Sequence, residues 1–267
     1  MLPYVEIFGV SLPMYGIISI IGVFASGLVA LGICKKRKVD KYDFIFTALV
    51  AGFGLLVGAH LLYAITRAED IITIFGDYSY YRDIWDFLGN LWSIVSGMVF
   101  YGGLYGGLLA GFLFAKSRRY PLADMSDLFA VAIPLFHAFG RVGCFFAGCC
   151  YGMKWEHGIA GRVLTQGMRE SAKRLPVQLV EAMCLVVIFF VMLWLCSKNR
   201  LKGRLIFVYL IIYAVVRFTL EFFRGDEIRG RLWIFSTSQW ISLTTLVWVG
   251  LYLYITFVKK RKLNKLT

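Results

Sequence analysis

The sequence predicts an all-α, polytopic integral membrane protein with seven transmembrane helices. Of its 267 residues, 59% are hydrophobic, and the mean hydropathy is +0.71. Soluble domains contain about 45–50% apolar residues, so this composition is typical of a chain that crosses a bilayer several times. The net charge of +13 comes from basic residues that form short clusters between long apolar runs. Because this distribution is typical of membrane topology, we expect no nucleic-acid partner.

Seven runs are long enough to span the bilayer core, which needs about 20 apolar residues per helix. In chain order, we expect helices over residues 7–34, 44–66, 91–115, 123–148, 176–196, 205–223 and 232–258. The first run lacks a basic leader and a small-residue cleavage site, so we expect a retained helix there rather than a signal peptide. The chain is then a single membrane domain, 1–267, with small extracytoplasmic loops near 67–90 and 151–175.

The clusters of basic residues predict the orientation of these helices. The first, third and fifth connections and the C-terminal tail hold 17 of the 29 Lys and Arg residues. The second, fourth and sixth connections hold 10, together with nine acidic residues. Because Lys and Arg are enriched in cytoplasmic loops, we expect the N-terminus outside and the C-terminus in the cytoplasm.

Two arginines lie inside apolar runs, and the first belongs to HAFGRVGCFFAGCCYG, residues 137–152. Helical spacing puts His137, Arg141 and Cys144 on one face. An arginine within a membrane helix costs about 2.5–3.5 kcal/mol on insertion scales, so it normally faces the protein interior and marks a functional site. The structural alternative is an arginine that ties helices together through backbone carbonyls.

The second arginine belongs to RFTLEFFRGD, in which Arg217, Glu221 and Arg224 share a helix face. An ion pair between Arg217 and Glu221 would make this segment a structural bridge. The face nevertheless keeps a net positive charge, which favours an anion site. Arg141 and Arg217 both lie toward the outer ends of their expected helices. We therefore expect one shared site near the outer leaflet.

The third run contains FYGGLYGGLLAG, whose glycines recur at every fourth residue. Small residues at this spacing let a second helix approach closely, which is the simplest interpretation. The alternative is that the glycines leave room for a lipid headgroup beside Tyr101 and Tyr105.

Three of these segments together resemble the bacterial prolipoprotein diacylglyceryl transferase family. GRVGCFFAGCCYG is similar to the family signature G-R-x-G-N-F-x-N-x-E-x-x-G, FYGGLYGG to its H-G-G-L segment, and RFTLEFFRGD to its R-x-x-x-E-F-F-R segment. PVQLVEA and SQWIS resemble two later family patterns. The segments follow the family's order over most of the chain, and the expected helix number and orientation are those of the family.

The resemblance implies a multi-pass transferase of the bacterial inner or plasma membrane. Such enzymes move the diacylglyceryl group of phosphatidylglycerol onto the lipobox cysteine of a preprolipoprotein and release glycerol phosphate. The implied partners are phosphatidylglycerol, the lipobox segment and the membrane itself. We expect no cofactor and no bound metal.

By match to the family, Arg141 and Arg217 are catalytic residues that hold the departing phosphate, because guanidinium groups bind phosphate in a bidentate manner. Glu221 would orient Arg217, and Tyr101 and His137 are the further catalytic candidates. The resemblance also implies a set of substrate-binding residues. These are Tyr15, Gly102, Gly103, Gly140, Gly143, Cys144, Cys149, Gly152 and Arg224.

The chain departs from the family pattern at several positions. Tyr101 replaces the histidine before G-G-L, and His60 stands where many members have arginine. The Asn, Asn and Glu of the signature are replaced by Cys144, Ala147 and Cys149. A tyrosine with an ordinary pKa of about 10 is a poor base near neutral pH. Either Tyr101 only hydrogen-bonds the lipid, or His137 collects the proton of the acceptor thiol.

The cysteines support a competing function. The six are Cys34, Cys144, Cys149, Cys150, Cys184 and Cys196. We favour small buried packing residues, with a disulfide or a metal or redox site as the alternatives. The spacing C-x4-C-C with distant histidines matches zinc sites poorly. The alternative function is a thiol-redox membrane protein that uses Cys144, Cys149 and Cys150. A transporter has less support, because no inverted repeat is evident.

Overall fold

The computed structural model describes residues 3–7, 9–76, 82–165, 168–225 and 231–263, most of them in helices. The chain divides into two compact units. The larger unit combines Met1–Arg37 with Ser126–Thr267, and the smaller unit is Lys38–Met125.

The smaller unit is built from four helices: α2 (Lys41–Thr66), α3 (Ala68–Gly76), α4 (Ile84–Val95) and α5 (Phe100–Ser117). Aspartates cap two of them at the N-terminus. Asp40 accepts a hydrogen bond from the backbone N of Tyr42 at 2.8 Å, and Asp83 accepts one from Asp86 N at 2.8 Å. Such side chains satisfy the first backbone donors of a helix, which explains where α2 and α4 begin.

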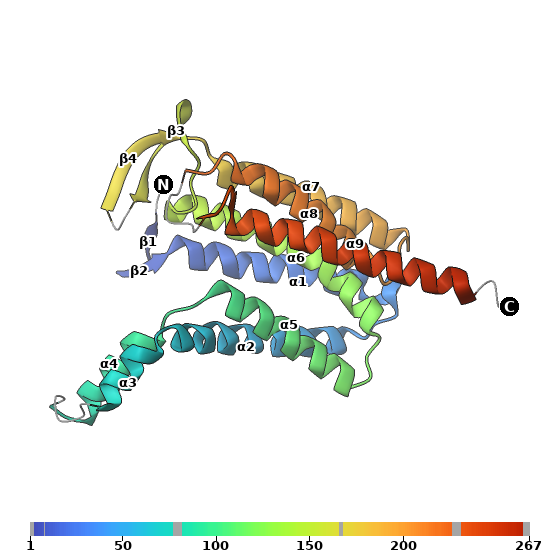
Figure 1. Cartoon of the computed structure of the whole chain (residues 1–267), viewed down its shortest axis with the longest axis horizontal. Coiled ribbons are helices and arrows are strands. Elements are labelled where there is room, and N and C mark those ends of the chain that lie inside the picture. Colours follow the sequence, from blue (N-terminus) through green and yellow to red (C-terminus); the bar gives the residue numbers. More distant parts are fainter. Residues whose placement is uncertain (1–2, 8, 77–81, 166–167, 226–230, 264–267) are drawn as a thin grey trace. The chain divides into compact units, whose positions relative to one another are not determined.

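Glycines bring α2 and α5 together, and the two helices run side by side in Figure 1. A Cβ atom added to Gly58 of α2 would lie 2.9 Å from Gly106 Cα of α5 and would also collide with Gly102 O. A Cβ on Gly103 would lie 3.2 Å from Leu55 O. Backbone contact at this distance requires glycine, as in other closely packed membrane helices. Helix packing therefore accounts for the glycine run.

The larger unit contains five helices that run alongside one another (Figure 1). They are α1 (Met14–Arg37), α6 (Leu122–Ala147), α7 (Val177–Ser197), α8 (Leu205–Glu221) and α9 (Thr237–Leu263). The described part of this unit also has three antiparallel strand pairs. β1 (Tyr4–Ile7) and β2 (Val10–Pro13) precede α1. β3 (Lys154–Thr165) and β4 (Met168–Arg174) lie between α6 and α7, and β5 (Arg231–Leu232) and β6 (Phe235–Ser236) lie between α8 and α9. The first four residues of α6 belong to the smaller unit.

The helices correspond to the runs expected from the sequence, with shifted boundaries. The first helix begins at Met14 rather than at residue 7, because Tyr4–Ile7 and Val10–Pro13 pair as β1 and β2. The third begins at Phe100, because α4 ends at Val95. The expected loop at 151–175 contains the β3–β4 hairpin, and that at 67–90 contains α3 and the start of α4.

The mostly helical membrane class is thereby confirmed in its coarse form. Among the residues that the structure describes, four helices are long and apolar enough to cross a bilayer: α1, α2, α6 and α7. Seven spans, their orientation and a single membrane domain stay predictions.

One fully buried ion pair holds several elements of the larger unit together. Arg37 Nη1, at the end of α1, lies 3.0 Å from Asp127 Oδ2 of α6, and neither side chain is exposed. Asp127 also accepts hydrogen bonds from the backbone N of Gly203 at 2.6 Å and of Leu205 at 3.0 Å. Because Leu205 is the first residue of α8, this carboxylate caps that helix. We call Arg37, Asp127 and these two amides the Arg37 cluster.

Candidate active site

A buried carboxylate of α7 brings both predicted arginines to one place. Glu181 is fully buried, and its Oε1 lies 3.1 Å from Arg141 Nη2 of α6. Its Oε2 lies 3.7 Å from Arg217 Nη1 of α8. The side chains of Arg141 and Arg217 are 14% and 9% exposed. Three helices therefore converge through charged groups that the apolar interior would otherwise disfavour.

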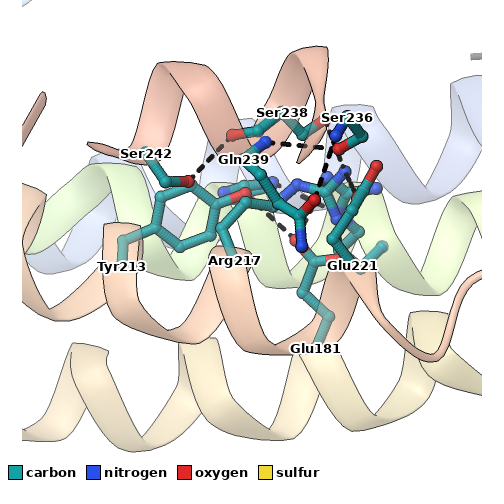
Figure 2. A network of polar contacts seen from close by, with 10 residues as sticks. Glu181, Tyr213, Arg217, Glu221, Ser236, Ser238, Gln239 and Ser242 are labelled. Carbon is teal, nitrogen blue, oxygen red and sulfur yellow. Dashed lines mark hydrogen bonds and ion pairs between the residues drawn. The ribbon is translucent and has the colours of Figure 1, made fainter. Parts of the chain in front are cut away.

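Residues of α8 and α9 complete this arrangement, which Figure 2 shows from close by. Arg217 Nη2 lies 2.6 Å from Glu221 Oε2 and donates to Ser238 Oγ at 3.0 Å. The Tyr213 hydroxyl donates to Glu181 Oε1 at 3.0 Å. The Glu181 cluster is the name used below for Arg141, Glu181, Tyr213, Arg217, Glu221 and Ser238.

Two buried polar atoms of the Glu181 cluster could form further hydrogen bonds. Within the described part of the chain, Arg217 Nη1 and Glu181 Oε2 are buried without a hydrogen-bond partner, although the two atoms form the 3.7 Å ion pair. A buried polar atom left in this state costs about 1–3 kcal/mol. A bound anion that accepts from Arg217 Nη1 would remove part of that cost.

His137 lies one helical turn before Arg141 and is already engaged. Arg141 Nε donates to His137 Nε2 at 3.3 Å, and the imidazole packs edge-on against the Tyr213 ring with centroids 5.0 Å apart. A neutral imidazole has one donor and one acceptor nitrogen, so this bond places the proton on Nδ1. In this arrangement Nε2 is not available to take a second proton.

The end of α6 gathers the three cysteines of the signature segment. The Sγ atoms of Cys144, Cys149 and Cys150 all lie within 4.8 Å of one another, and each residue is half-buried and forms no disulfide. Hydrogen bonds from the Cys144 and Cys149 thiols, together with the charge of Arg224, lower the pKa of Cys150 below its ordinary value, although burial opposes this shift. We call these three residues the cysteine cluster.

Arg224 and Gly152 lie beside each other just beyond α8. They form an isolated antiparallel bridge, and Gly225 N donates to Tyr151 O at 3.1 Å. α8 ends at Glu221, so Arg224 reaches this position through the following turn and not as part of the expected helix face. A Cβ on Gly152 would lie 2.6 Å from Val177 Cγ2, which explains the glycine.

Tyr15 and the remaining glycines of the signature lie nearby on α1 and α6. A Cβ on Gly143 would lie 2.9 Å from Tyr15 Cδ2, so the missing side chain makes room for the tyrosine ring. Gly140, by contrast, has open space where its Cβ would be.

The other predicted site residues belong to the smaller unit. Tyr101 is half-buried in the first turn of α5, and Gly102 and Gly103 are buried against α2. His60 Nδ1 of α2 lies 3.0 Å from Gly97 O, in the connection between α4 and α5. Substrate-binding roles for the two glycines stay predictions.

The predicted set of site residues omits the carboxylate at the centre of the Glu181 cluster. Glu181 and Gln178 interrupt the apolar run of α7, and a charged residue inside such a run is itself a signal of a functional site. Tyr213 and Ser238 carry no comparable signal, because hydroxyl groups are common in membrane helices.

Comparison with known proteins identifies the family. Residues 3–256 match the family model described as prolipoprotein diacylglyceryl transferase. The chain belongs to the prolipoprotein diacylglyceryl transferase family. This confirms the resemblance found in the sequence.

Relatives in this family align over almost their full length. A protein of Clostridium tetani is 34% identical over 251 residues, which cover 93% of this chain and 94% of the relative. One of Clostridium perfringens is 31% identical, covering 96% of each chain. One of Clostridioides difficile is 28% identical, covering 97% and 96%. All three are named phosphatidylglycerol–prolipoprotein diacylglyceryl transferase.

Proposed function

We propose that this protein transfers the diacylglyceryl group of phosphatidylglycerol to the lipobox cysteine of a preprolipoprotein, and that the Glu181 cluster holds the headgroup phosphate. The observation that supports this assignment is the meeting of Arg141 and Arg217, from separate helices, at the single carboxylate of Glu181. Guanidinium groups bind phosphate in a bidentate manner, and Glu181 holds two of them at one place.

The reaction needs stabilisation of a departing anion. The acceptor sulfur attacks a glycerol carbon of the lipid and forms a thioether, while the carbon–oxygen bond to phosphate breaks and glycerol phosphate leaves. Arg141 and Arg217 bind the phosphate oxygens, and their charge is worth more in a water-poor site than in bulk water. Both guanidinium groups are mostly buried, so they are shielded from competing solvent.

The two carboxylates have positioning roles. Glu181 contacts both arginines and accepts from Tyr213, so it fixes the orientation of the pair. Glu221 holds Arg217 from the other side at 2.6 Å. An apolar cleft of about 190 Å³ is lined by Leu175, Val177, Val180, Leu220 and Phe223. Two of these residues, Val180 and Leu220, directly precede Glu181 and Glu221 in the sequence. Such a surface suits an acyl chain.

The proton of the acceptor thiol needs a destination other than His137 Nε2, which accepts from Arg141. In the proposed mechanism Tyr101 hydrogen-bonds the lipid. The thiol is acidified by the positive charge of the site, as thiols beside arginine are in general. A Tyr101→Phe variant that loses all transfer activity would contradict this assignment.

The proposed setting is the bacterial inner or plasma membrane, with seven spans, the N-terminus outside and the C-terminus cytoplasmic. Basic residues cluster at the C-terminal ends of α1, α5, α7 and α9, a distribution that agrees with the positive-inside rule for this orientation. This orientation puts the ends of α6 and α8, and with them the Glu181 cluster, near the outer leaflet.

Complementation tests the proposal. The gene should restore lipoprotein modification in a strain depleted of its own diacylglyceryl transferase, and the purified protein should transfer radiolabelled glycerolipid to a lipobox peptide. Arg141→Ala should lower the transfer rate by about 10²- to 10³-fold, the loss typical of one positioned charge donor. Arg118→Ala, at an exposed residue after α5, is the control. Absence of transfer by the folded wild type would overturn the activity, and unchanged transfer by Arg141→Ala would overturn the phosphate role.

A further inference from the structure

The C-terminal turn of α6 explains how two of the three clustered thiols meet. Gly148 has φ +75°, its N donates to Phe145 O at 3.3 Å, and Cys149 N donates to Cys144 O at 3.2 Å. These two bonds form a Schellman motif, in which the residue after the left-handed glycine folds back over the last turn of the helix. The motif therefore brings Cys149 next to Cys144.

The third thiol reaches this pair through a second left-handed residue. Cys150 has φ +59°, which is uncommon for a residue with a Cβ and costs about 1–2 kcal/mol. A packing role for the cysteines would not need this conformation, because the Cys149 thiol already contacts Cys144 O at 3.7 Å without it. The conformation is what places the third Sγ within 4.8 Å of the other two. Backbone strain of this kind is often found at functional sites.

We propose that Cys144, Cys149 and Cys150 bind one Zn²⁺ ion through their three sulfur atoms and leave its fourth coordination position open. Three thiolates at a Zn–S distance of about 2.3 Å in a tetrahedral shell lie about 3.8 Å from one another. The three sulfur atoms already lie within 4.8 Å, so small side-chain rotations are enough. Thiolates select zinc and copper(I) over magnesium and calcium.

The surroundings of the cysteine cluster suit such an ion. Zn²⁺ with three thiolates carries a net charge of −1, and the guanidinium groups of Arg224 and Arg141 act on Cys150 and Cys144, respectively, from nearby. Gln178 Nε2 donates to Cys149 O at 2.7 Å and fixes the backbone of the turn, as outer-shell partners of metal sites do. The half-buried thiols leave a path for the ion to enter. The spacing of these cysteines does not predict a metal site, whereas their positions in the turn do.

The open position has a chemical consequence that rests on the proposed function. Zinc with three protein ligands accepts a fourth, and the acceptor in the proposed reaction is a cysteine thiol. Coordination would form a Zn–S bond and release the thiol proton to water. The bound thiolate would then form the C–S bond as the C–O bond to phosphate breaks, and the neutral thioether would leave the zinc. This route needs no protein base in place of the missing histidine.

Metal analysis of the purified full-length protein tests the site itself. Elemental analysis, which also reports copper and iron, should find close to one zinc per chain, the stoichiometry of a single three-cysteine site. Cys144→Ser, Cys149→Ser and Cys150→Ser should each lower the zinc content at least about tenfold, whereas Cys184→Ser, at a half-buried thiol of α7, should not. A metal-free protein with three reactive thiols, a protein lighter by two hydrogens because of a disulfide, or a different metal would each overturn the proposal.

Cobalt substitution separates the metal site from the transfer reaction. The Co²⁺ protein should show thiolate-to-cobalt charge-transfer bands, and a lipobox peptide with cysteine should change them, whereas the same peptide with serine should not. If the cysteine peptide leaves these bands unchanged while the enzyme still transfers lipid, the zinc does not bind the acceptor thiol. The metal would then have only a structural role. A peptide-dependent spectrum in a protein without transfer activity would overturn the proposed function and leave the zinc site standing.

Discussion

Arg37 and Arg141 are both buried arginines of the larger unit held by a carboxylate, yet their surroundings differ. In the Arg37 cluster one arginine meets one aspartate, and neither side chain is exposed. Asp127 also accepts from two backbone amides, at 2.6 and 3.0 Å. In the Glu181 cluster two arginines share the carboxylate of Glu181, and Glu221 pairs with Arg217 alone. The groups that contact Glu181 there, Arg141, Arg217 and Tyr213, are all side chains.

The groups that bind the central carboxylate therefore distinguish a structural cluster from a binding site. Each cluster leaves one guanidinium nitrogen without a hydrogen bond among the described residues, Nη2 of Arg37 and Nη1 of Arg217. An unsatisfied arginine nitrogen alone thus marks neither kind of site. Backbone amides on Asp127 fix the start of α8, which is a folding role. Side-chain partners on Glu181 can rearrange when an anion arrives, and Arg141 and Arg217 keep partial exposure.

Of the three variants that compare the two clusters, Glu181→Gln should lower the rate of lipid transfer most. The substitution keeps the shape of the side chain but removes the charge that holds the two guanidinium groups together, so they repel each other. We expect the initial rate of lipid transfer, per folded molecule, to fall by about 100-fold, as for the loss of one positioned charged group. A rate within about threefold of wild type would show that the cluster is not the reaction site.

Asp127→Asn should lower the stability of the protein and leave its transfer rate almost unchanged. Removing one partner of a buried ion pair costs about 3–5 kcal/mol, so we expect the free energy of unfolding in detergent to fall by that amount. The transfer rate per folded molecule should stay within about threefold of wild type. Asp70→Asn is the control, because the Arg67–Asp70 pair is 47% exposed on both sides and is expected to contribute less than about 1 kcal/mol. A large loss of specific activity in Asp127→Asn would erase the distinction between the clusters.

Within the Glu181 cluster, Tyr213→Phe should lower the transfer rate less than Glu181→Gln does. It removes the hydroxyl that donates to Glu181 Oε1 and leaves the ring against His137. A hydrogen bond to a charged group contributes about 1.5–3 kcal/mol, and part of it is replaced by Arg141, so we expect a rate loss of about 5- to 10-fold. Tyr209→Phe is the control. The ring of Tyr209 stacks on that of Tyr213, with centroids 5.9 Å apart. Equal losses in both variants would show that the effect is not specific to the hydrogen bond between Tyr213 and Glu181.

The sequence allowed the helices and the two site arginines to be predicted, because long uncharged runs and charges inside them are local signals. Arg37 and Asp127 were not recognised as buried. Arg37 lies in the basic KKRK cluster, which resembles a solvated loop, and Asp127 lies near the start of an expected helix. Their pairing depends on how α1, α6 and the connection before α8 pack, and no periodicity encodes that.

The cysteine cluster was also beyond sequence reasoning. Its geometry depends on two left-handed residues, Gly148 and Cys150, and only the glycine has a recognisable tendency toward that conformation. For residues 151–175 the sequence likewise predicts a loop, because these residues are mixed in charge and polarity. The structure has the β3–β4 hairpin there.

Headgroup binding tests the central claim most directly, because it does not depend on turnover. Calorimetric titration of the purified protein with short-chain phosphatidylglycerol should give an affinity that Arg217→Gln lowers by about 10- to 100-fold, the value of a charged hydrogen bond. Affinity for short-chain diacylglycerol, which lacks the phosphate, should be the same in both proteins. Equal affinity of wild type and Arg217→Gln for phosphatidylglycerol would contradict a phosphate site at the Glu181 cluster.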